Sequence, residues 1–159
     1  MSTSLTSLKR GRAIHLLDIE NLCGSSLLTP TMVEKVRASY AAAVSIGPRD
    51  QIVLASAHIS LLAMADGWPN ARYQVRSGKD GADICLATIM VDENLADRFE
   101  HVIVGSGDGG LSPFVAEMAG RGSRVTVVSR MAAISPRMCL AATGVIYLDS
   151  PVSAIALAA

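Results

Sequence analysis

The sequence has little net charge, few aromatic side chains and no long apolar segment, and each shortage excludes a class of protein. Its 14 Lys and Arg residues balance 14 Asp and Glu residues, so any binding of a polyanion must come from a local patch. Aromatic residues make up 4% of the chain and hydrophobic residues 50%, which predicts an aliphatic core. No apolar run reaches the ~18 residues of a membrane-spanning helix, so we expect no membrane partner.

Cysteine is also scarce, and the three residues Cys23, Cys85 and Cys139 stand far apart. Their spacing matches no zinc motif and no disulfide framework, which predicts reduced thiols in a cytoplasmic protein. The N-terminal stretch is polar and lacks the apolar segment of a secretion signal. We therefore expect a cytoplasmic protein.

What the sequence does contain is a regular alternation of short apolar runs and helical segments. The expected strands are 13–17, 51–57, 72–75, 102–104, 124–128 and 145–148. The expected helices are 30–45, 60–65, 80–95, 111–120 and 136–142. Such alternation predicts an α/β fold, a three-layer α/β/α sandwich with a mainly parallel sheet. We expect one domain over 13–150, a flexible N-terminal tail over 1–12 and an apolar C-terminal tail over 151–159.

Three acidic residues are expected to meet at one edge of this sheet. Asp18 ends the first strand, Asp83 falls in the first turn of the helix after the third strand, and Asp108 follows the fourth. In an open parallel sheet these positions share the edge at which ligands bind, and the first and fourth strands are expected to be neighbours there. Clustered carboxylates repel one another unless a cation neutralises them. Mg²⁺, a hard ion with oxygen ligands, suits such a site and can activate water for hydrolysis of a phosphodiester.

Three motifs occur in order: Asp18-x-x-Asn21, Lys79-x-Gly81-x-Asp83 and Ser106-Gly107-Asp108. This set resembles the NYN domain, a PIN-like nuclease group that includes the LabA-like proteins. The resemblance covers about 13–148 and implies a metal-dependent endoribonuclease with Mg²⁺ or Mn²⁺ held by the three Asp residues. It also implies that Asn21 and Ser106 position the substrate, and that two copies of the chain associate as a homodimer.

Two basic residues, Arg76 and Lys79, precede the helix that carries Asp83, and we expect them to hold the phosphate backbone of RNA. Two other hypotheses stay open. Gly110 and the acid-free stretch 84–91 stand where family members commonly carry further acids, so the protein could be a catalytically silent module that binds RNA or protein. The glycine pattern from Gly105 to Gly110 also fits a dinucleotide-binding turn. His15, inside the first strand, is expected to be a satisfied core histidine.

Overall fold

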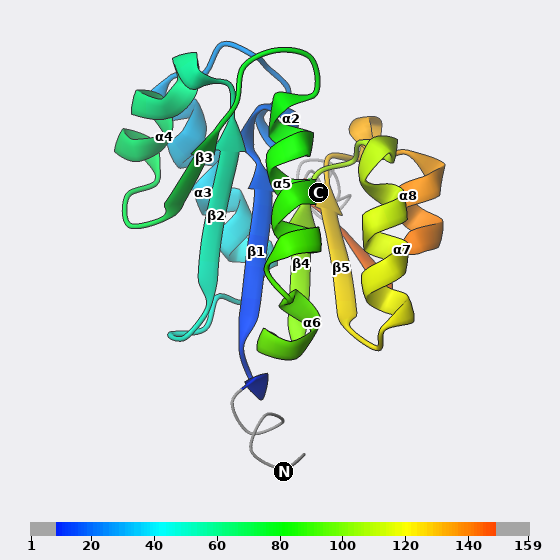
Figure 1. The fold of residues 1–159 in the computed structure, drawn as a ribbon. Coiled ribbons are helices and arrows are strands. Elements are labelled where there is room, and N and C mark those ends of the chain that lie inside the picture. Colours follow the sequence, from blue (N-terminus) through cyan, green and yellow to red (C-terminus); the bar gives the residue numbers. More distant parts are fainter. Residues whose placement is uncertain (1–8, 149–159) are drawn as a thin grey trace, which may run out of the picture.

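The computed structural model describes residues 9–148, which form a parallel sheet covered by helices on both faces (Figure 1). The strands are β1 (Ala13–Asp18), β2 (Gln51–Ser56), β3 (Arg72–Val75), β4 (His101–Gly105), β5 (Arg124–Ser129) and β6 (Gly144–Tyr147). Their order across the sheet is β3-β2-β1-β4-β5-β6, and each neighbouring pair is parallel. The α/β sandwich predicted from the sequence is confirmed, and so is the pairing of β1 with β4.

Helices follow most of the strands, as right-handed crossovers between parallel strands require. They are α2 (Ile19–Cys23), α3 (Pro30–Ala43), α4 (Leu61–Gly67), α5 (Gly81–Asp92), α6 (Leu95–Arg98), α7 (Ser112–Gly120) and α8 (Pro136–Ala141). Single 3₁₀ turns are η1 (His58–Ser60), η2 (Gly109–Leu111) and η3 (Met131–Ala133). In Figure 1, α5 and α7 lie on one face of the sheet and α3 on the other.

Both faces of the sheet are buried at its centre, because alternate residues of β1, β2, β4 and β5 enter two separate cores. In β1, Ile14 and Leu16 pack into the core that holds residues of α5 and α7, whereas Leu17 packs into the core of α2, α3 and α4. All six residues of β1 are buried. This explains why the central strand is read from the sequence as a near-continuous apolar run.

Two local features differ from the sequence prediction. A single helix over 80–95 was expected, but α5 ends at Asp92 and α6 begins at Leu95. Asn94 between them has φ +49°, a left-handed conformation that Asn tolerates better than most residues, and it interrupts the helix. The helix α2, which was not predicted, starts directly after β1 because the Asp18 carboxylate accepts a hydrogen bond from the Asn21 N–H.

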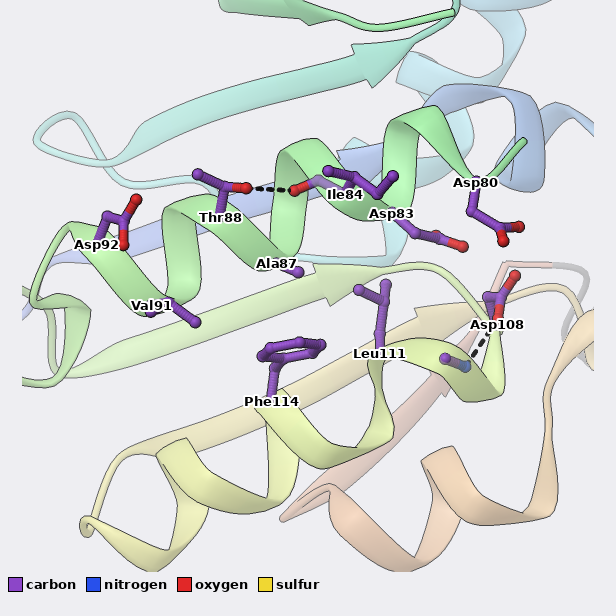
Figure 2. A pocket seen from close by; sticks show the side chains of 11 residues that line it. Asp80, Asp83, Ile84, Ala87, Thr88, Val91, Asp92, Asp108, Leu111 and Phe114 are labelled. Atoms are coloured by element: carbon purple, nitrogen blue, oxygen red, sulfur yellow. Dashed lines mark hydrogen bonds between the residues drawn. The ribbon is translucent and has the colours of Figure 1, made fainter. Parts of the chain in front are cut away.

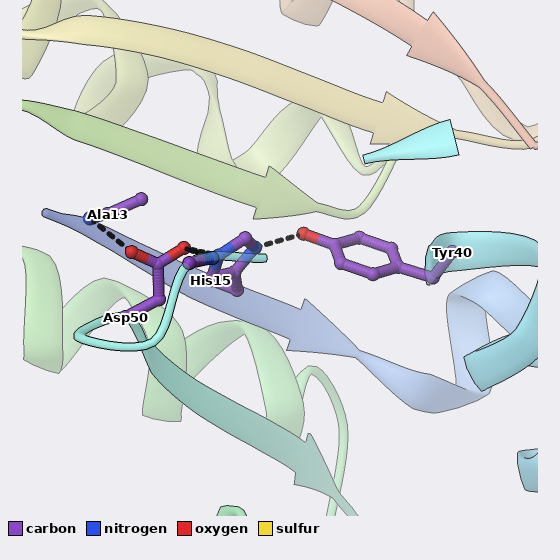
Figure 3. A network of polar contacts seen from close by, with 5 residues as sticks. Ala13, His15, Tyr40 and Asp50 are labelled. Atoms are coloured by element: carbon purple, nitrogen blue, oxygen red, sulfur yellow. Dashed lines mark hydrogen bonds and ion pairs between the residues drawn. The ribbon is translucent and has the colours of Figure 1, made fainter. Parts of the chain in front are cut away.

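His15 is fully buried and satisfied, as predicted (Figure 3). Its Nε2 lies 2.8 Å from Asp50 Oδ2, and its Nδ1 is hydrogen-bonded to the Tyr40 hydroxyl. Asp50 also accepts hydrogen bonds from the Ala13 and Gly47 N–H groups. Burial lowers the pKa of His15, although the hydrogen bond to Asp50 opposes this. The network joins the start of β1 to the turn before β2. It therefore lies at the amino ends of the strands, away from the three acids at their carboxyl ends.

The structure describes only part of the two predicted tails. The apolar tail over 151–159 and residues 1–8 of the predicted N-terminal tail lie outside the described residues. The three cysteines are free. In the described part of the chain, no helix combines the length and apolar character needed to cross a membrane.

Candidate functional site

The predicted acids gather at the edge of the sheet where the parallel strands end. Asp18 is the last residue of β1, Asp83 lies in the first turn of α5, and Asp108 follows β4. A cavity of about 230 Å³ is lined by all three, together with Asn21 and Arg76. Five of the seven residues singled out from the sequence thus share one cavity.

The tightest acidic cluster in the described residues has a different membership from the predicted triad. Asp80, Asp83 and Asp108 each offer an oxygen within 4.8 Å of the others, and Figure 2 shows their side chains converging. Asp80 was not predicted, and Asp18 is not part of this group. Asp80 directly precedes α5 with φ +57°, so its place in the cluster depends on this backbone angle and carries no signal in the sequence.

The carboxylate of Asp83 is only partly hydrogen-bonded. Its Oδ1 is buried and has no hydrogen-bond partner. Burial raises its pKa to about 7, and a hydrogen bond to Asp108 and the negative charges of Asp108, Asp18 and Asp80 add to the rise. A carboxylate in this position is short of positive charge, so at neutral pH it holds a proton or requires a cation.

Asp18 lies beside this cluster and is 7% exposed. One of its oxygens is used to cap α2 through the Asn21 N–H, at 3.1 Å. Burial raises the pKa of Asp18 to about 6, with smaller contributions from the charges of Glu20 and Asp108, while the bond to Asn21 lowers it. Asp18 therefore has both a structural role and an electrostatic link to Asp108.

Asn21 and Ser106 brace the turn that carries Asp108. The Asn21 side-chain oxygen accepts a hydrogen bond from the Gly107 N–H at 3.1 Å, and the buried Ser106 Oγ accepts one from the Asp108 N–H at 3.2 Å. Asp108 Oδ1 accepts from the Gly110 N–H at 2.8 Å. Ser106 does not line the cavity, so the contact that the structure gives it is with the turn.

The two basic residues are placed differently. Arg76 is exposed and lines the cavity, whereas Lys79 is exposed on the turn before α5 and is not among the lining residues. A third basic residue, Arg130, follows β5, and its Nε donates a hydrogen bond to the Asn21 carbonyl at 3.1 Å. This contact ties the end of β5 to α2 and could not be read from the sequence, since the two residues are far apart along the chain.

The donor set fits a hard divalent cation. Carboxylate oxygens are the ligands that Mg²⁺ and Mn²⁺ prefer, and a bound cation would satisfy the unpartnered Asp83 oxygen and relieve the repulsion that raises its pKa. Asp80, Asp83 and Asp108 could therefore hold a metal ion.

A family model for the NYN domain matches residues 37–149, well over half of the chain. The chain belongs to the NYN domain family. This confirms the resemblance drawn from the three motifs and indicates a nuclease-type function for the protein. The matched part of this NYN domain contains Asp80, Asp83 and Asp108, while Asp18 and Asn21 precede it.

Similarity to a solved structure supports the fold of this NYN domain. A protein of unknown function from Vibrio parahaemolyticus superimposes with a TM-score of 0.60 at 18% sequence identity, covering 87% of this chain and 93% of that chain. At this identity the likeness shows the fold alone. No curated protein matches the chain.

Proposed function

We propose that this NYN domain is a divalent-metal-dependent endoribonuclease that hydrolyses phosphodiester bonds of RNA at the acidic cluster. The observation that carries the proposal is the buried Oδ1 of Asp83, which has no hydrogen-bond partner although it belongs to a group of three converging carboxylates. Such an uncompensated carboxylate pair costs stability unless it serves a ligand.

The residues take distinct parts in this proposal. Asp83 and Asp108 hold Mg²⁺ or Mn²⁺ together with Asp80 or Asp18. When bound, the ion supplies a Lewis acid for a phosphate oxygen and the means to activate water for attack. Arg76, on the cavity wall, holds the negative backbone of the substrate, and Lys79 extends this contact along the strand. Asn21 and Ser106 keep the Asp108 turn in place beside the substrate.

The deciding experiment is cleavage of a labelled single-stranded RNA with Mn²⁺, compared with EDTA and with Asp108→Asn. The Asn side chain keeps an oxygen that can accept from the Gly110 N–H, so we expect the variant to fold and to lose at least 100-fold in rate, the order seen when a group that stabilises the transition state is removed. Asp18→Asn is expected to behave in the same way. Full activity of both variants would contradict the proposed site.

A second candidate is a module that binds RNA or protein without cleaving it. It is favoured by Gly110 and by the stretch 84–91, which bring no acid to the cluster. Isothermal titration separates the two candidates, because sub-millimolar Mn²⁺ affinity that is lost in Asp108→Asn speaks against the silent module.

The setting of this activity is also a proposal. We infer a cytoplasmic protein from the unpaired cysteines and from the RNA substrate. We further infer that two copies associate, which sedimentation of the purified protein tests directly.

A further inference from the structure

An apolar groove runs away from the acidic cluster between α5 and α7 (Figure 2). Its volume of about 500 Å³ lies within the range of small-molecule and cofactor sites. One wall carries Asp83, Ala87, Val91 and Asp92 of α5. The other carries Asp108 in the turn before η2, Leu111 in η2 and Phe114 in α7. Both walls thus begin with a carboxylate of the candidate site and continue as apolar side chains, and the α5 wall ends at Asp92.

The chemistry of the groove changes along its length. Asp80, Asp83 and Asp108 lie at one end, and the Phe114 ring and Val91, which is 60% exposed, lie further along. Asp92 follows Val91 at the far end. No Lys or Arg is among the lining residues. A phosphate group in the apolar part would meet no positive charge, whereas a flat, uncharged ring would be removed from water there and could stack on Phe114.

The groove offers few hydrogen bonds to a ligand along its apolar part. The Thr88 hydroxyl is already engaged, since it donates to the Ile84 carbonyl at 2.7 Å. Ala87, Val91, Leu111 and Phe114 are apolar, and the exposed Asp92 carboxylate at the far end offers only hydrogen-bond acceptors. A ligand would therefore be held by stacking and apolar contact, which tolerate every nucleobase because each has an aromatic face.

We propose that this groove receives one unpaired base of the RNA, that of the nucleotide next to the phosphodiester at the acidic cluster. The inference rests on the proposed nuclease function and adds the part of the substrate that the groove contacts. A base inside an A-form duplex is stacked between its neighbours and cannot enter. The continuity of the groove with Asp83 and Asp108 places base and phosphate in one binding site.

The test measures binding rather than cleavage. Fluorescence anisotropy with labelled six-nucleotide RNAs is recorded in Ca²⁺, with a gel confirming that the RNA stays intact, and each RNA of a series lacks one base. We expect one abasic RNA to lose about 5- to 100-fold in affinity, the loss typical of one base–aromatic stack. Phe114→Leu is expected to lose a similar factor, and the two changes together no more than either alone, because both remove the same contact.

Controls separate this result from a general loss of folding. Val91→Asn alters the α5 wall of the groove at an exposed position. It should also weaken binding of the RNA that keeps all its bases. Leu62→Ala changes a side chain on α4 that is 77% exposed and far from the groove in the fold, and should leave the affinity unchanged. A duplex of the same sequence should bind at least 5-fold more weakly.

Several outcomes would overturn the inference. If removal of a base lowers the affinity for RNA by the same factor in Phe114→Leu and in the wild-type protein, no base contacts Phe114, even if the RNA is bound and cleaved. If deletion of residues 149–159 raises the affinity for RNA, and removal of any one base leaves that affinity unchanged, the groove would be assigned to that C-terminal segment. Absence of both RNA binding and RNA cleavage would remove the proposed function itself, and the inference with it.

Discussion

Replacing Asp83 by Asn is expected to stabilise the metal-free protein at pH 8, although Asp83 lies in the candidate active site. Its pKa of about 7 in the folded state is above its ordinary value of 3.8, so the folded protein binds this proton more tightly than the unfolded chain does. The free energy of unfolding is therefore reduced as the pH rises from ~4 to ~7, and the full reduction is present above that interval.

The size of this effect follows from the same pKa values. Each pKa unit corresponds to ~1.4 kcal/mol, so the interval from 3.8 to about 7 sets an upper limit of ~4 kcal/mol. Solvent screens part of this difference, because Asp83 is partly exposed. We therefore expect a gain of about 1–2 kcal/mol for Asp83→Asn. For a chain of this length that gain raises the melting temperature by ~2–8 °C.

Thermal unfolding at pH 5 and pH 8, in EDTA and in Mn²⁺, checks this reasoning. In EDTA the variant should melt higher than wild type at pH 8, with a smaller difference at pH 5. With Mn²⁺ at about 100 times its dissociation constant, wild type should gain ~2.7 kcal/mol and the order should reverse. Asp66→Asn, an exposed change on α4, is the matched control. A variant that is less stable than wild type at pH 8 in EDTA would refute the electrostatic account.

Two further predictions concern residues that support the fold. Asp50→Ala leaves His15 and two backbone N–H groups without their acceptor, so the free energy of unfolding in urea should fall by about 2–4 kcal/mol, and Asp50→Asn should cost less. Gly81→Ala places a Cβ against the Arg76 carbonyl oxygen, so it should cost about 1–3 kcal/mol and weaken Mn²⁺ binding measured by titration. Gly120→Ala, where a Cβ meets nothing within 4 Å, is the control.

The fold could be predicted because its signals are local and repeated. Apolar runs such as the one around Leu16 need cover on both faces, and this requirement selects a parallel sheet with helices on each side. The edge shared by Asp18, Asp83 and Asp108 follows from that topology alone. No side-chain detail was needed to bring the three acids to one region.

The composition of the acidic cluster could not be predicted, because it depends on single backbone angles. Asp80 joins Asp83 and Asp108 in a left-handed conformation with φ +57°, and a sequence does not specify which Asp adopts it. Asp18 was expected to face the metal, but the start of α2 directs one of its oxygens to the Asn21 N–H. The groove beside Phe114 depends on the separation of α5 and α7, which follows from packing of the whole core.

The central place of β1 has a consequence for how this protein can be shortened. The family model begins at residue 37, whereas β1 lies before it and pairs with both β2 and β4. A fragment cut at the start of the match would lose the middle of its sheet and expose two long, apolar strand edges, which invite aggregation. The segment that identifies the family is thus smaller than the unit that folds, and recombinant fragments need to retain the residues from Lys9 onward.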